Sequence, residues 1–255
     1  MSKPDVKALL EAGVHFGHRT DKWNPRMKPY IYEARNGIHV INLNKTADQI
    51  ADAFSFLRGQ ASDGNKILFV GCKKQAQEAV KKAAQDSEAF YVTERWLGGT
   101  LTNLPTIRRS VARMREIDEM EKSGKMKALP TKQEISALRR ESMKLHRYLD
   151  GIQDMEAPPK VLVIVDVSRE TIAVKEALRL NIPIVALTDT NADPSDIDYP
   201  IACNDDAIRS IRIILEHLKA AVQEGLSKYK GTRPSTKSPK ESDEPTKEEM
   251  EAISA

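Results

Sequence analysis

The segment KILFVGCKKQAQEAV, residues 66–80, predicts a buried strand followed directly by a helix. Ile67–Val70 is an unbroken apolar run that ends at Gly71, and the pattern from Lys73 to Gln85 is helical. The same alternation predicts strands at 89–92, 161–165, 183–187 and 199–202, and helices at 170–180 and 205–229. Unbroken apolar strands separated by helices are typical of a parallel sheet covered on both faces. We therefore expect an α/β fold with a doubly wound, mainly parallel sheet flanked by helices.

The N-terminal part of the chain has a different pattern. Residues 3–12 predict a helix with Val6, Leu9 and Leu10 on one face, and a second helix is expected from Asn44 or Thr46 to Arg58. Between them, short apolar runs at 30–33 and 38–41 around Asn36-Gly37 predict a β-hairpin, with a longer loop closed by Asn36-Gly37 as the alternative. The polar and aromatic segment before the hairpin is expected to be a loop, because two prolines exclude regular helix there.

Residues 103–150 predict an insertion between the two α/β stretches. Apolar residues at steps of three and four predict helices at 103–122 and 131–149, which together would form an antiparallel coiled-coil hairpin about 30 Å long. The segment carries 12 basic and 7 acidic residues, so we expect a positively charged arm whose apolar stripes pack mainly on each other. Residues 1–102 and 151–230 would then form the globular domain, and the Ser-, Pro- and Glu-rich residues 231–255 a disordered tail.

Composition limits the class of protein. The chain has 255 residues, two cysteines without CxxC spacing and no apolar run long enough for a membrane span, so we expect a cytoplasmic protein. Its net charge of +3 is unevenly distributed. Residues 1–150 carry 27 basic and 18 acidic residues, a balance of +9, whereas residues 151–255 carry 13 and 19, a balance of −6. A basic half of this size favours a polyanionic partner.

Motifs for small-molecule chemistry are weak. The Gly71 turn resembles a phosphate-binding turn, but neither GxGxxG nor GxxxxGK[ST] is present, so a simple strand-to-helix turn is favoured. His15 and His18 have a spacing that two metal ligands can have, but zinc needs three or four ligands, which favours packing or RNA contact instead. Neither GxSxG nor HExxH occurs, and we assign no catalytic residue. A sugar-phosphate or nucleotide enzyme stays the alternative, because fold alone does not exclude catalysis.

Basic residues interleaved with aromatic ones give the stronger signal. Cationic side chains beside stacking surfaces are typical of RNA-binding loops, although helical charge runs are often only solvated faces. The candidate RNA-binding residues are Arg19, Lys22, Trp23, Arg26, Lys28, Arg35, Lys73, Lys74, Arg95, Arg108, Arg109 and Arg113.

Acidic residues follow three of the predicted strands, namely Asp166, Asp189 and the pair Asp205-Asp206. The carboxyl ends of parallel strands meet at one edge of a sheet, so these carboxylates should lie close together. They are expected mainly to cap turns and pair with nearby arginines. The sharper hypothesis is that Asp189 and Asp206 hold a divalent cation, with a histidine of the 15–18 segment, or receive a basic face of a partner protein.

Several strings resemble the bacterial ribosomal protein S2 family over about residues 5–228. They are LLEAGVHFGH (9–18), KWNPRMKPYIYEARNGIHVINLNKT (22–46), KILFVGCKKQAQEAV (66–80), YVTERWLGGTLTNLPTIRRS (91–110), IPIVALTDTNADPSDIDYPI (182–201) and NDDAIRSIRI (204–213). The resemblance implies an α/β domain with a helical insertion, which the arm-less archaeal and eukaryotic relatives lack.

The resemblance also implies the role of the chain. It would be a non-catalytic protein of the small ribosomal subunit that binds small-subunit rRNA where head meets body. It would also contact other small-subunit proteins and help to anchor the mRNA-binding protein built of repeated OB domains. We expect it to act as a single copy on the ribosome rather than as a homo-oligomer, and to need no cofactor apart from the cation considered above.

Overall fold

The computed structural model of the protein describes residues 3–125 and 131–232. Its larger sheet is parallel, with the strand order β5–β4–β6–β7–β8. The strands are β4 Ile67–Val70, β5 Phe90–Val92, β6 Val161–Val165, β7 Ile184–Thr188 and β8 Tyr199–Ala202. In the register, Ile67 lies opposite Val161 and Leu162 opposite Ile184. The expected α/β fold with a mainly parallel sheet is confirmed.

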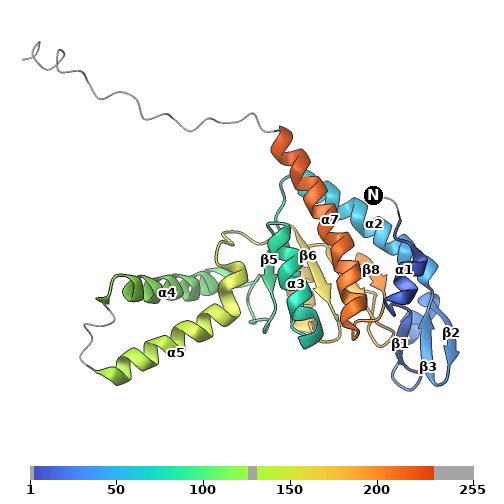
Figure 1. Ribbon diagram of the computed structural model, residues 1–255, viewed down its shortest axis with the longest axis horizontal. Coiled ribbons are helices and arrows are strands. Elements are labelled where there is room, and N and C mark those ends of the chain that lie inside the picture. The colour runs from blue at the N-terminus through green and yellow to red at the C-terminus, as the bar shows by residue number, and fades with distance from the viewer. Residues whose placement is uncertain (1–2, 126–130, 233–255) are drawn as a thin grey trace, which may run out of the picture.

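Helices cover both faces of this sheet (Figure 1). The α-helices of the described residues are α1 Val6–Glu11, α2 Leu43–Ser62, α3 Lys74–Asp86, α4 Leu104–Lys122, α5 Lys132–Leu149, α6 Thr171–Arg179 and α7 Ile208–Thr232. Side chains of a strand alternate between the two faces. Ile67 and Phe69 belong to a core shared with α2, α3 and α7. Leu68 and Val70 belong to the opposite core, shared with α6 and the first half of α4.

A second, smaller sheet is antiparallel, with the order β1–β3–β2. Its strands are β1 Phe16–Arg19, β2 Ile31–Arg35 and β3 Ile38–Ile41. The predicted hairpin is confirmed: Asn36 (φ 51°) and Gly37 (φ 75°) connect β2 to β3 in the left-handed conformation that a two-residue hairpin turn requires. The prediction of a loop before the hairpin is wrong in part. That segment contains strand β1 and a 3₁₀ helix, Pro25–Tyr30. Leu10 is 52% exposed, so it does not share the buried face of Leu9.

The arm consists of α4 and α5, which project from the sheet domain (Figure 1). Ion pairs join the two helices, such as Arg113 Nε to Glu141 Oε1 at 3.1 Å and His146 Nε2 to Asp118 Oδ1 at 2.9 Å. The expectation that the apolar stripes pack mainly on each other stays a prediction beyond Met114, where Ile117 is fully buried outside both sheet cores. Leu104 to Met114 on α4 belong to the core under the parallel sheet, and Met143 on α5 is 65% exposed. The start of α4 is therefore anchored in the globular core, whereas α5 is mostly exposed.

Two expectations concern the ends of elements and the tail. Helix α7 continues to Thr232, beyond the predicted end at residue 229 and into the segment expected to be a tail. The rest of that segment, 233–255, and residues 126–130 between the arm helices lie outside the described residues. Among the helices of the described residues, none is long and apolar enough to cross a membrane.

Candidate nucleic-acid interface

Strand β1 places His18 at the carboxyl edge of the parallel sheet. Phe16 lies opposite Val40, and Arg19 lies opposite Ile38. Strand β1 therefore has one more residue than β3 between these two pairs, which makes a β-bulge. Within the bulge, Gly17 lies against Thr190, where a Cβ would come within 2.6 Å of Thr190 Cγ2. The amide of His18 donates to Thr190 Oγ1 at 2.8 Å. Gly17 is therefore needed for the small sheet to pack against the end of β7, where the backbone amide of residue 18 fixes the contact.

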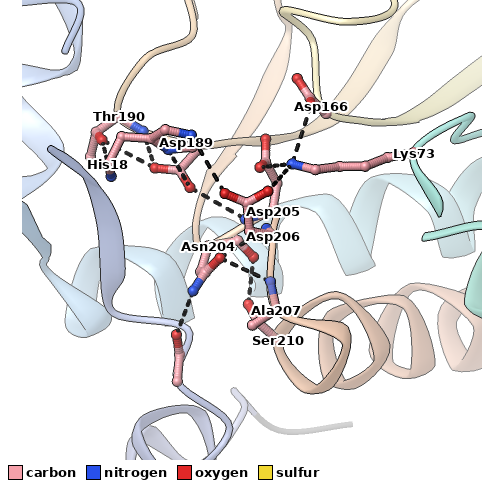
Figure 2. Close-up of polar contacts among 11 residues, drawn as sticks. His18, Lys73, Asp166, Asp189, Thr190, Asn204, Asp205, Asp206, Ala207 and Ser210 are labelled. Carbon is pink, nitrogen blue, oxygen red and sulfur yellow. Dashed lines mark hydrogen bonds and ion pairs between the residues drawn. The ribbon is translucent and has the colours of Figure 1, made fainter. Parts of the chain in front are cut away.

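Figure 2 shows the ionic cluster that forms at this edge. Lys73 Nζ lies 2.6 Å from Asp205 Oδ1, 2.6 Å from Asp206 Oδ1 and 3.3 Å from Asp166 Oδ2. The carboxylates that follow β6, β7 and β8 thus meet at one edge, as the strand ends predict.

The imidazole of His18 completes this cluster from the small sheet. Its Nδ1 lies 3.1 Å from Asp189 Oδ2 and its Nε2 3.5 Å from Asp206 Oδ2. The two sheets are therefore joined by ionic contacts between β1 and the residues that follow β7 and β8.

The charges of the cluster shift the pKa values of its members. Burial, together with the negative charges of Asp166 and Asp189, raises the pKa of Asp205 to about 7. The hydrogen bond with Asp189 raises the pKa of His18 above its ordinary value. Burial alone would lower the pKa of Lys73, but its hydrogen bonds to Asp205 and Asp206 outweigh that effect and raise it. The ammonium of Lys73 therefore stays charged and offsets the repulsion among the carboxylates.

Asp189 and Asp206 were predicted to hold a divalent cation or to contact a basic partner protein. Within residues 3–125 and 131–232, no group of three or more His, Cys, Asp and Glu side chains is arranged to hold a metal ion. Lys73 supplies the positive charge that was expected from a divalent cation, and the cation itself stays a prediction. Asp189 is 1% exposed and cannot receive a partner's basic face, whereas the side chain of Asp206 is 56% exposed. The His15 ring packs on that of Phe16, with centroids 4.0 Å apart, whereas His18 contacts Asp189 and Asp206.

The turn after β4 is occupied by side chains of the protein itself. The amide of Cys72 donates to Glu170 Oε1 at 3.1 Å, in the place where a phosphate oxygen would be bound in a nucleotide site. A Cβ on Gly71 would lie 2.8 Å from Val80 Cγ2, so this glycine permits close packing of α3 on β4. Burial raises the pKa of Glu170 and, to about 12, that of the Cys72 thiol. These contacts favour the simple strand-to-helix turn over nucleotide binding.

Glu176 is a key residue that the sequence analysis missed. It lies on the buried face of α6 and accepts hydrogen bonds from Trp96 Nε1 (3.0 Å) and from the amides of Gly99 (2.7 Å), Leu101 (2.9 Å) and Thr102 (3.0 Å). Burial alone would raise the pKa of Glu176, but these hydrogen bonds outweigh it and lower the pKa. The loop before α4 is thus folded around one carboxylate, which fixes the base of the arm. The available signal was an acidic residue on the apolar stripe of a predicted helix.

The basic residues predicted to bind RNA divide into two groups. Within the described part of the chain, seven are exposed and have no ion pair: Lys22, Lys28, Arg35, Lys74, Arg95, Arg108 and Arg109. Three others are paired: the exposed Arg19 with Asp21, the exposed Arg26 with Asp193, and the half-buried Arg113 with Glu116 and Glu141. Such surface pairs are weak, and these arginines can exchange a carboxylate for a phosphate.

Lys73 and Trp23, two of the predicted RNA contacts, have other partners within the protein. Lys73 is buried and held by three carboxylates, so its assignment as an RNA contact is wrong and it is an internal ion-pair residue. Trp23 is half-buried, and its ring packs on that of His39 with centroids 5.1 Å apart. Its indole therefore contributes to the packing of the small sheet and is only partly available to RNA.

The exposed basic residues lie on different elements of the molecule. Figure 1 shows the small sheet at one end of the long axis and the arm at the other. Lys22, Lys28 and Arg35 belong to the small-sheet end, whereas Arg108 and Arg109 lie in the second turn of α4, at the base of the arm. They form two separate basic surfaces rather than one patch.

Comparison with known families decides the identity of the chain. A family profile described as ribosomal protein S2 matches residues 9–225, a span that includes both sheets and both helices of the arm. The chain belongs to the ribosomal protein S2 family. Ribosomal protein S2 is a structural, non-enzymatic component of the small ribosomal subunit that acts in translation and associates with rRNA and other ribosomal proteins. The S2 match covers all the candidate RNA-binding residues and the Lys73 cluster.

Proposed function

We propose that this chain binds small-subunit rRNA near the junction of head and body through two separate basic surfaces. The supporting observation is the set of exposed basic side chains without ion pairs at the small-sheet end and on α4. Side chains of this kind neutralise phosphates without competing with an internal carboxylate. Because one surface lies on the small sheet and the other in the second turn of α4, at the base of the arm, they would contact two different segments of the rRNA.

The helical arm supports assignment to the bacterial type of the family, because arm-less relatives lack the segment that forms α4 and α5. The arm begins in a loop that Glu176 folds from inside the domain, so its direction is set by the globular core. A fixed arm can hold a distant rRNA segment, which is the role we propose for it.

The family resemblance further supports anchoring of the mRNA-binding multi-OB protein by a single copy of this chain. Asp206, exposed at the carboxyl edge of the sheet, is the acidic residue there that a basic partner surface can reach. The proposed divalent cation at Asp189 and Asp206 would have to share this edge with Lys73. Metal content measured on wild type and on Asp189→Asn/Asp206→Asn tests the cation directly, since equal content in both would contradict it.

Sedimentation of the tagged chain through a sucrose gradient tests the proposed function. We expect co-migration with small subunits at moderate salt, and reduced co-migration when Lys28, Arg35, Arg108 and Arg109 are changed to Gln. A matched control changes Lys7, Lys82, Lys175 and Arg179 to Gln, which are exposed basic residues of α1, α3 and α6 outside both surfaces. Failure of the wild-type chain to co-migrate with small subunits would contradict the proposal.

A further inference from the structure

The small sheet has one face turned away from the domain. On β3, His39 and Ile41 are buried, whereas Ile38 is 38% exposed and Val40 is half-buried. Residues opposite each other in an antiparallel pair share a face. The register therefore places two rows across the three strands on the outer face, Phe16–Val40–Glu33 and Arg19–Ile38–Arg35. The same bulge that directs His18 to the domain directs Phe16 and Arg19 to this outer face.

Phe16 is an aromatic residue of this face, and its ring is held in place from one side, whereas Tyr32 on β2 is 70% exposed. The His15 ring lies against it, with centroids 4.0 Å apart and planes inclined by 39°. Gly13, at φ +75°, brings the preceding turn close to the ring, since a Cβ there would lie 3.6 Å from Phe16 Cδ2. Phe16 nevertheless remains 51% exposed. A half-exposed ring that is packed from behind offers a stacking surface at little cost in side-chain entropy.

The charges around this ring favour a nucleic acid over other partners. Arg19 and Arg35 stand on the two outer strands of the second row, about 7 Å along the strands from the first row. Arg35 has no ion pair within the described residues, and Arg19 is paired only with Asp21, at 3.3 Å on the surface. Glu33, in the row of Phe16, would repel a phosphate but can accept a hydrogen bond from a base amino group. The first row therefore suits a base and the second suits phosphates.

We propose that the outer face of the small sheet binds an unpaired nucleotide of the rRNA, with the base stacked on Phe16 and the flanking phosphates held by Arg19 and Arg35. This inference rests on the proposed rRNA binding and specifies its ligand at the small-sheet end. Unpaired bases in loops and bulges stack on aromatic side chains, whereas bases inside an RNA helix are not accessible to such a surface. The small-sheet surface is thereby assigned to single-stranded RNA and the arm to a different segment.

Filter binding of the full chain to transcribed small-subunit rRNA tests the inference. We expect Phe16→Ala to weaken binding by about 5- to 150-fold, the range of one stacked base. The slope of log affinity against log salt should not change, because no charge is removed. Phe16→Trp should restore affinity, while Arg35→Gln should flatten the slope by roughly 0.7 to 0.9. Leu10→Ala on α1, which is 52% exposed, is the matched control for loss of an exposed apolar side chain.

Phe16→Leu is a second variant for the case that Phe16→Ala unfolds the small sheet. The leucine side chain keeps the contact with His15 but has no aromatic ring. Dimethyl sulfate probing of the rRNA should show unpaired bases that wild type protects and Phe16→Leu does not. The inference would be overturned if wild type binds the rRNA and Phe16→Leu binds it with the same affinity as Leu10→Ala. That result would leave the proposed function intact. Absence of binding by wild type would instead overturn both. Unchanged rRNA affinity with loss of a neighbouring protein from purified subunits would identify the face as a protein contact and also overturn the inference.

Discussion

Replacement of Lys73 by Met would remove the buried positive charge of the cluster while keeping an unbranched side chain of similar length. The ammonium is 2.6 Å from both Asp205 and Asp206, and Lys73 is 9% exposed. Removing one partner of a buried ion pair costs about 3–5 kcal/mol. Asp206 is accessible to water, so its share is small, and we expect a loss of about 3 kcal/mol at pH 8. Because the pKa of Asp205 is about 7, this carboxyl can take up a proton at pH 5, and the loss should be smaller there.

Urea unfolding followed by circular dichroism at pH 5 and pH 8 measures this difference. Lys74→Met is the control, because Lys74 is adjacent, exposed and without an ion pair in the described chain, and should change stability by less than about 0.5 kcal/mol. Adding Asp205→Asn to Lys73→Met should recover part of the missing stability, since it removes the uncompensated buried charge. Equal unfolding midpoints for Lys73→Met and Lys74→Met at pH 8 would refute the assignment of Lys73 to an internal ion pair.

Three further predictions concern the arm and its base. Glu176→Gln should lower the free energy of unfolding by about 2–4 kcal/mol, because one acceptor becomes a donor facing buried amides; a thermal melt within about 1 °C of wild type would contradict this. Hydrogen bonds to Asp118 and Asp150 raise the pKa of His146, so the contribution of His146 to arm stability is present below pH 6.5 and disappears as pH rises through the raised value. Amide exchange of α5 should therefore be faster at pH 8 than at pH 6 after correction for intrinsic rates, and His146→Gln should abolish that difference. Replacing residues 103–150 by a Gly/Ser linker should leave a folded domain of reduced stability, since Leu104 to Met114 belong to the core; melting identical to the full chain would show that they add nothing.

The sequence predicted those parts of the fold that depend on local patterns. The strands of the parallel sheet are unbroken apolar runs, and the β2–β3 turn depends on Asn36-Gly37 alone. The meeting of the carboxylates also followed from the sequence, because strand order does not alter which edge the carboxyl ends share.

The remaining features depend on contacts between distant residues. Strand β1 has no apolar alternation, and its position is set by Thr190, 172 residues away from His18. Lys73 has the sequence context of a surface lysine until Asp205, 132 residues further on, is placed beside it. In the arm, periodicity predicted an apolar stripe on α4 but not that its first half, from Leu104 to Met114, joins the core under the parallel sheet.

The salt dependence of binding to small-subunit rRNA tests the central claim most directly. Removal of one phosphate-binding side chain should flatten the log-log salt slope by roughly 0.7 to 0.9. Changing Lys28, Arg35, Arg108 and Arg109 to Gln should therefore flatten it by about 3 and weaken binding at low salt. The control variant with Lys7, Lys82, Lys175 and Arg179 changed to Gln should keep the wild-type slope. Equal slopes for the two variants would contradict the claim that the small-sheet end and the arm are the rRNA-binding surfaces.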